Sequence, residues 1–144
     1  MTVSRSLSDL HEYLANAFVK AQAEFKTLYP ELPQPFITCT FRSRQEQDRL
    51  YAQGRTKPGM KVTNARAGQS VHNYLPSFAF DIAFKRGNAL DWDIDLFKKF
   101  AAIIAKDKNV EWGGSWKSFP DAPHFQFKNF TWKQAQAGEQ PKIK

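Results

Sequence analysis

The sequence contains one cysteine and no long apolar run. A lone Cys39 cannot form an internal disulfide, which excludes a disulfide scaffold and a zinc finger built from cysteines. No apolar run approaches about 18 residues, so no transmembrane helix is predicted. The first residues lack the apolar segment of a secretory signal. We therefore expect synthesis in the cytoplasm without a signal peptide, and action elsewhere only after release from the cell.

Several common catalytic motifs are also missing. The patterns HExxH, Walker A, GxSxG and GxGxxG do not occur, which removes the zinc helix of many proteases, nucleotide-binding loops and the serine elbow of hydrolases. Cys39 lies in a strand pattern that buries it, and buried thiols in apolar surroundings are inert. A cysteine nucleophile is therefore not expected.

Positive charge is abundant. The chain has 21 Lys and Arg against 14 Asp and Glu, a net charge of +7. Residues 42–66 contain seven basic and two acidic residues, so they contribute +5 of that total. Such a balance favours an anionic partner, although a solvated surface would look the same. No RNP-like strand, helix-turn-helix signature or basic helix supports nucleic-acid binding.

Hydrophobic periodicity predicts one α+β domain over residues 1–144, with a flexible tail at 138–144. We expect a small, mainly antiparallel sheet with helices packed on one side and the site on the open sheet face. Residues 54–70 read as a long polar binding loop. The expected helices cover 7–28 and 44–53, with a third that is capped by Asp93 or Asp95 and carries apolar residues from Leu96 to Ile104. The expected strands cover 36–41, 78–84 and 124–127.

Alternation along the first strand assigns its side chains to two faces. One face would carry Ile37, Cys39 and Phe41, and the other would carry Thr38, Thr40 and Arg42. An arginine at the end of that strand could bind a carboxylate or stabilise an oxyanion. Arg42 could equally be an ordinary surface residue.

Asp81 lies in the middle of an otherwise apolar strand. A buried carboxylate needs a cation, hydrogen-bond donors or a metal, so Asp81 is either a hydrogen-bonded core residue or part of a site. Two histidines and one aspartate form an accepted zinc ligand set with a fourth position left for water, and His72 and His124 could complete it. The remaining histidine, His11, is not expected to bind metal.

Asp121 precedes His124 by three residues and is followed, with one residue between, by Pro123. A carboxylate at that position could act as a general base toward a water held at the site. Alternatively it only forms the turn, as aspartate beside proline commonly does.

Taken together, these segments resemble the LAS-type zinc peptidases, most closely the L-alanyl-D-glutamate endopeptidase branch that includes phage endolysins. The resemblance covers residues 36–127. The segments that carry it include Ser70-Val-His72, Ala79-Phe-Asp81, Trp112-Gly-Gly-Ser-Trp116 and Asp121-Ala-Pro-His124.

The resemblance implies a role for each matching residue. His72, Asp81 and His124 would hold one zinc ion, Asp121 would be the general base, and Arg42 would polarise the scissile carbonyl. Positions that match residues lining the site are Ser70, Gln47 and Trp116. The implied substrate is the peptidoglycan stem peptide, cut by a monomer that reaches the wall after holin-type release or lysis.

Two features depart from the family pattern. Eight residues separate His72 from Asp81, where the family usually has six, so we expect a small bulge before the second strand that preserves the direction of Asp81. Ser115 stands where the family usually has aspartate. The alternatives to the endopeptidase are a D,D- or L,D-carboxypeptidase on the same scaffold and a catalytically inactive wall-binding module.

Overall fold

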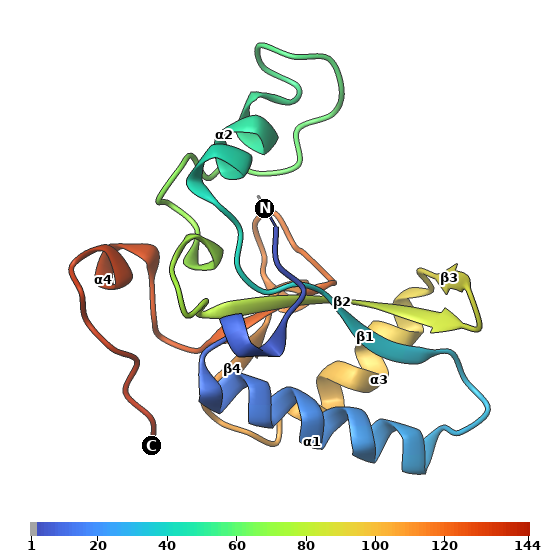
Figure 1. The fold of residues 1–144 in the computed structure, drawn as a ribbon. Coiled ribbons are helices and arrows are strands. Elements are labelled where there is room, and N and C mark those ends of the chain that lie inside the picture. The colour runs from blue at the N-terminus through green and yellow to red at the C-terminus, as the bar shows by residue number, and fades with distance from the viewer. Residues whose placement is uncertain (1–2) are drawn as a thin grey trace.

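The computed structural model describes residues 3–144, and an antiparallel sheet runs through its centre (Figure 1). The strands are β1 (Gln34–Cys39), β2 (Ala79–Arg86), β3 (Ala89–Asp91), β4 (Val110–Trp112) and β5 (His124–Phe127). Their order is β1-β2-β5-β4, and β3 pairs with β2 outside this path. The long central strand β2 is therefore hydrogen-bonded to strands from both halves of the chain.

Two helices cover one face of this sheet. Helices α1 (Glu12–Leu28) and α3 (Ile94–Ile104) lie side by side beneath it, while α2 (Arg44–Ala52) and the loop after it stand on the other side (Figure 1). The buried cluster under the sheet is rich in aromatic rings, among them Phe80, Phe84 and Phe100. Each fully buried ring contributes about 1.5–3 kcal/mol. The predicted α+β architecture, with a mainly antiparallel sheet, is confirmed.

The remaining helical elements are short. They are η1 (Leu7–Asp9), η2 (Val71–Asn73), η3 (Gly113–Ser115) and α4 (Trp132–Gln136). No helix described in residues 3–144 combines the length and the apolarity needed to cross a bilayer. Near the C-terminus, the backbone N–H of Lys144 donates to the side-chain oxygen of Asn109 at 3.0 Å. The flexibility expected for 138–144 stays a prediction.

The first helix begins later than its apolar stripe predicts. Ser6 caps only the short η1 turn, and α1 starts at Glu12 with His11 as its N-cap. The backbone between them is extended because it pairs with Ser77: His11 N–H donates to Ser77 C=O at 2.9 Å, and Ser77 N–H donates to Asp9 C=O at 2.8 Å. A contact with a distant segment therefore overrides the helical periodicity.

A bulge lies on β1 rather than before β2. Ile37 pairs with Ile82 and Cys39 pairs with Asp81, so Thr38 is the additional residue. The expectation that Cys39 and Arg42 face opposite ways is wrong, because the bulge turns Cys39 toward Asp81, and its Sγ lies 3.8 Å from Arg42 Nη2. Between η2 and β2, residues 74–78 form the loop in which Ser77 pairs with Leu10.

Candidate metal centre and active site

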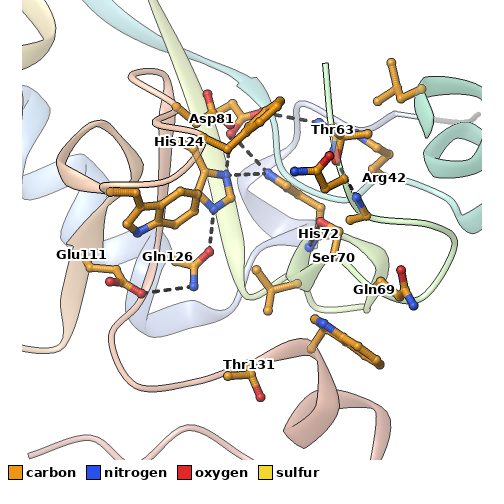
Figure 2. A pocket seen from close by; sticks show the side chains of 18 of the residues that line it. Arg42, Thr63, Gln69, Ser70, His72, Asp81, Glu111, His124, Gln126 and Thr131 are labelled. Atoms are coloured by element: carbon orange, nitrogen blue, oxygen red, sulfur yellow. Dashed lines mark hydrogen bonds and ion pairs between the residues drawn. The ribbon is translucent and has the colours of Figure 1, made fainter. Parts of the chain in front are cut away.

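Three side chains from three elements converge near the start of β2 (Figure 2). His72 comes from η2, Asp81 from β2, and His124 from the β5 residue paired directly with Asp81. Asp81 Oδ1 lies 3.2 Å from His72 Nε2 and 3.0 Å from His124 Nδ1, and the two nitrogens are 3.2 Å apart. A tetrahedral zinc ion would hold its ligand atoms about 3.3 Å apart, so this triangle has the size that zinc requires.

The outer nitrogen of each ring decides what the inner one can do. His72 Nδ1 lies 2.8 Å from Thr40 C=O, which can only accept, so Nδ1 carries the proton and Nε2 presents a lone pair. His124 Nε2 lies 2.7 Å from Gln126 Oε1, which leaves Nδ1 as a lone pair. With Asp81, three acceptors thus point at one place, and only a metal cation or additional protons can hold them together.

The electrostatics agree with a site that attracts positive charge. Burial by itself lowers the pKa of His72, but the Asp81 carboxylate outweighs it and raises that pKa to about 10. Burial raises the pKa of Asp81, but the two imidazoles outweigh it and hold that pKa well below its usual range. Without a metal, His72 therefore holds a proton that a bound cation would displace.

Cys39 gives a second arrangement of possible ligands. Its Sγ lies within 4.8 Å of ligand atoms of His72 and Asp81. The thiol, however, is 3.8 Å from His72 Nδ1, the nitrogen already bonded to Thr40 C=O. Cys39 thus lies behind the imidazole ring, and the arrangement with His124 is the one that uses free lone pairs.

Asp121 lies in a half-buried position on the wall of the same cavity. Burial raises the pKa of its carboxyl, and the negative charge of Asp81 raises it further. No hydrogen bond to this carboxylate is found among residues 3–144. It can therefore take up a proton more readily than an exposed aspartate.

The Trp-Gly-Gly segment holds the turn that carries Asp121 and His124. Trp112 Nε1 donates to Ala122 C=O at 2.7 Å, and Asp121 N–H donates to Gly113 C=O at 2.9 Å. A Cβ atom on Gly113 would lie 2.6 Å from Asp121 C=O and 3.1 Å from His124 Cβ. Glycine is needed here because the two segments approach each other so closely.

Arg42 lines the cavity beside the triangle. Its Nη2 lies 3.4 Å from Asp81 Oδ2, and its Nη1 donates to Gln47 Oε1 at 3.1 Å. Gln47 is fully buried, and its Nε2 donates to Ala65 C=O at 2.9 Å. The structure thus places Gln47 beneath Arg42 and not on the cavity wall, where the resemblance suggested a lining residue.

An open cavity of about 840 Å³ lies above the triangle. Ser70 and Trp116, two of the expected lining residues, are on its wall, and the Trp116 ring lies 5.3 Å from that of His124. Ser70 also caps η2, accepting a hydrogen bond from His72 N–H at 3.2 Å. The predicted long loop is confirmed, and its segment 62–65 forms part of the wall (Figure 2).

Three contacts around the histidines did not emerge from the sequence. They are the carbonyl of Thr40, the amide of Gln126 and the carboxylate of Glu111, which accepts from Gln126 at 3.2 Å. Alternation along β5 places Gln126 on the same face as His124 and could have indicated it. Glu111 could not be assigned because β4 is only three residues long.

The chain is similar to several known proteins. A family model described as D-alanyl-D-alanine carboxypeptidase matches residues 63–127, a range that includes His72, Asp81, Asp121 and His124 but not Arg42. The crystal structure of Serratia marcescens L-Ala D-Glu endopeptidase ChiX matches the fold with a TM-score of 0.60, at 24% identity, over 88% of each chain.

Two curated relatives are similar in sequence. The peptidoglycan L-alanyl-D-glutamate endopeptidase CwlK of Bacillus subtilis (strain 168) is 44% identical over 99 residues, which are 62% of this chain and 58% of that protein. The L-alanyl-D-glutamate peptidase of Listeria phage A118 is 39% identical over 83 residues, 54% of this chain and 29% of that protein. The chain therefore matches only part of each relative's length. The sequence similarity to a D-alanyl-D-alanine carboxypeptidase family model and to two L-alanyl-D-glutamate peptidases agrees with the resemblance seen in the sequence, and the likeness to ChiX shows the same fold.

Proposed function

We propose that this chain is a zinc-dependent peptidoglycan hydrolase that cleaves the amide bond between L-alanine and D-glutamate in the stem peptide. The observation that carries the proposal is the triangle of three acceptor atoms, 3.0–3.2 Å apart, at the base of an open cavity beside Asp121. The names of the two curated relatives support the choice of bond.

In this proposal His72, Asp81 and His124 hold the metal, with the fourth position open to the cavity. Zinc, when bound, lowers the pKa of a water molecule to about 7 and polarises a carbonyl group. The outer hydrogen bonds of the two imidazoles keep their lone pairs aimed at the metal position.

Asp121 and Arg42 act on the substrate and the attacking water. Asp121 takes a proton from the attacking water and passes it to the leaving amine, a role that suits its raised pKa. Arg42 donates a hydrogen bond to the scissile carbonyl oxygen as negative charge develops there. Gln47 holds the Arg42 guanidinium in place, and Ser70 and Trp116 contact the peptide from the wall.

The biological setting follows from the substrate. We infer a monomer that acts on the cell wall, reached after holin-type release or lysis, as for a phage or prophage endolysin. The similarity to a Listeria phage peptidase supports this setting.

The direct test replaces one proposed ligand. His124→Ala should lose one equivalent of zinc by elemental analysis and should lose wall clearing. His11→Asn is the matched control, because His11 caps α1 away from the cavity, and it should keep both. Full lysis by His124→Ala would overturn the proposal.

The bond is identified by mass spectrometry of digested muropeptides. A new N-terminal D-glutamate indicates the endopeptidase, whereas release of free D-alanine indicates the carboxypeptidase, the activity in the description of the matching family model. A chelator separates both enzymes from an inactive wall-binding module, because only the enzymes need the metal.

A further inference from the structure

A polar chain continues outward from His124 along the sheet (Figure 2). His124 Nε2 lies 2.7 Å from Gln126 Oε1, and Gln126 Nε2 donates to Glu111 Oε1 at 3.2 Å. Glu111 and Gln126 are directly paired residues of β4 and β5, and Gln126 follows His124 by two residues on the same strand. The three side chains are therefore held on one face by the backbone ladder.

The donors and acceptors of these three side chains fix the direction of both hydrogen bonds. An ionised carboxylate can only accept, so Glu111 must face the amide nitrogen of Gln126. The amide oxygen then faces His124, and because it can only accept a hydrogen bond, Nε2 carries the hydrogen. Consequently Nδ1 keeps its lone pair and points at Asp81 and the metal position. If the Gln126 amide were reversed, its NH₂ group would face the Nε2–H of His124 and its oxygen would face the Glu111 carboxylate. Donor would then oppose donor, and acceptor would oppose acceptor.

We propose that Gln126 and Glu111 are positioning residues that, acting in series, select the Nε2–H form of His124 and so prepare its Nδ1 to bind metal. The inference rests on the proposed zinc function. Both residues also line the cavity, so direct contact with substrate is the competing explanation. The two explanations differ because a substrate contact changes KM and leaves the metal affinity unchanged.

The experiment measures zinc affinity by competition with a chromophoric chelator. Gln126→Met keeps the length of the side chain but removes the acceptor, and we expect a loss of about 10–100-fold in affinity. Gln136→Met, on the exposed surface of α4, is the matched control and should bind zinc as the unmodified chain does. Thermal unfolding of the metal-free proteins verifies that each variant is folded.

Exchange of the glutamate and the glutamine between positions 111 and 126 tests the direction of these hydrogen bonds. Gln126→Glu alone places two carboxylates side by side and should weaken zinc binding. The double variant Glu111→Gln/Gln126→Glu restores an acceptor facing His124 and a donor behind it, and its affinity should return to within about threefold of the unmodified chain. In the zinc-loaded proteins, NMR should show the His124 Nε2–H as a slowly exchanging proton, lost in Gln126→Met and regained in the double variant.

The outcomes separate the two claims. If the unmodified chain binds zinc but Gln126→Met keeps its affinity and its slowly exchanging proton, the positioning role is wrong and the proposed function stands. If Gln126→Met changes only KM, the residue contacts substrate and the positioning role is again wrong. If the unmodified chain binds no zinc, both proposals fail.

Discussion

The pKa values of two carboxylates in one cavity are shifted in opposite directions by their surroundings. The imidazoles around Asp81 outweigh its burial and hold its pKa well below the usual range. The pKa of Asp121 is raised by burial and by the negative charge of Asp81. Groups whose pKa values are separated in this way commonly divide into an ionised ligand or stabiliser and a proton carrier. At the residue scale, this contrast supports the proposed roles of Asp81 as a metal ligand and of Asp121 as a proton carrier.

The assignment predicts the behaviour of Asp121→Asn. The variant should keep its zinc, because Asp121 is not part of the ligand triangle, but its turnover of purified muropeptide should fall about 10²–10⁴-fold. Asp95→Asn, at an exposed position of α3, is the control and should leave turnover unchanged. An Asp121→Asn enzyme with full turnover would remove Asp121 from the mechanism.

The elements bring the site together through strand register. Asp81 and His124 are opposite residues of β2 and β5, so a slip of one residue would send one of them into the aromatic core. Helix α1 is attached to the same strand β5, because its cap His11 packs edge-on against Phe127, with ring centroids 4.9 Å apart. The two strands and the helix therefore depend on each other.

The cap of α1 predicts a pH effect on stability. Burial lowers the pKa of His11, with Glu12 opposing it, and its Nδ1 accepts from Tyr13 N–H at 3.1 Å only when the ring is neutral. Above about pH 6.5 the ring is neutral in both states, so the cap is intact. As the pH falls below that value, the unfolded chain takes up a proton that the folded chain resists, and the free energy of unfolding decreases.

Urea denaturation of the unmodified chain and of His11→Asn measures this effect. Asparagine keeps the cap but does not titrate, so the difference in stability between the two proteins should change between pH 8 and about pH 5.5. A difference that stays constant over this range would show that His11 does not titrate in the folded chain at a lowered pKa.

At the scale of the whole molecule, positive charge borders the cavity. The loop after α2 carries several basic residues and contributes cavity wall at 62–65, whereas α1 and α3 lie across the sheet (Figure 1). Some of these charges are engaged locally, since Arg55 stacks on Tyr51 at 3.8 Å. Lys57 and Lys61 are exposed, so they are available to attract an anionic substrate such as the proposed stem peptide.

Salt should therefore weaken the reaction. We expect kcat/KM on muropeptides to fall as ionic strength rises beyond about 0.1 M, where the Debye length is about 10 Å. Lys57→Gln/Lys61→Gln should lower kcat/KM at low salt and flatten the salt dependence. Lys20→Gln/Lys98→Gln removes the same charge from α1 and α3 and should behave like the unmodified chain. Equal effects of the two double variants would mean that only net charge matters.

Much of the site could be predicted because it follows from local rules. The alternation of the second strand already directed Asp81 away from Phe80 and Ile82, and the motif resemblance assigned His72 and His124 to the same centre. The direction of Asp81 needs only the period of a strand, whereas the grouping of the two histidines is what the resemblance implies. The long polar loop at 54–70 was a local signal of the same kind.

Other features were decided only by the tertiary structure, because they depend on contacts between distant residues. Pairing with Ser77 moved the start of the first helix from the expected Leu7 to Glu12, and the bulge at Thr38 turned Cys39 toward Asp81. The sequence by itself determined which residue types could bind a metal and which strand face carried the carboxylate. The packed fold decided that Gln47 lies beneath Arg42 and that Gln126 holds His124, since hydrogen-bond direction exists only when the partners are in place.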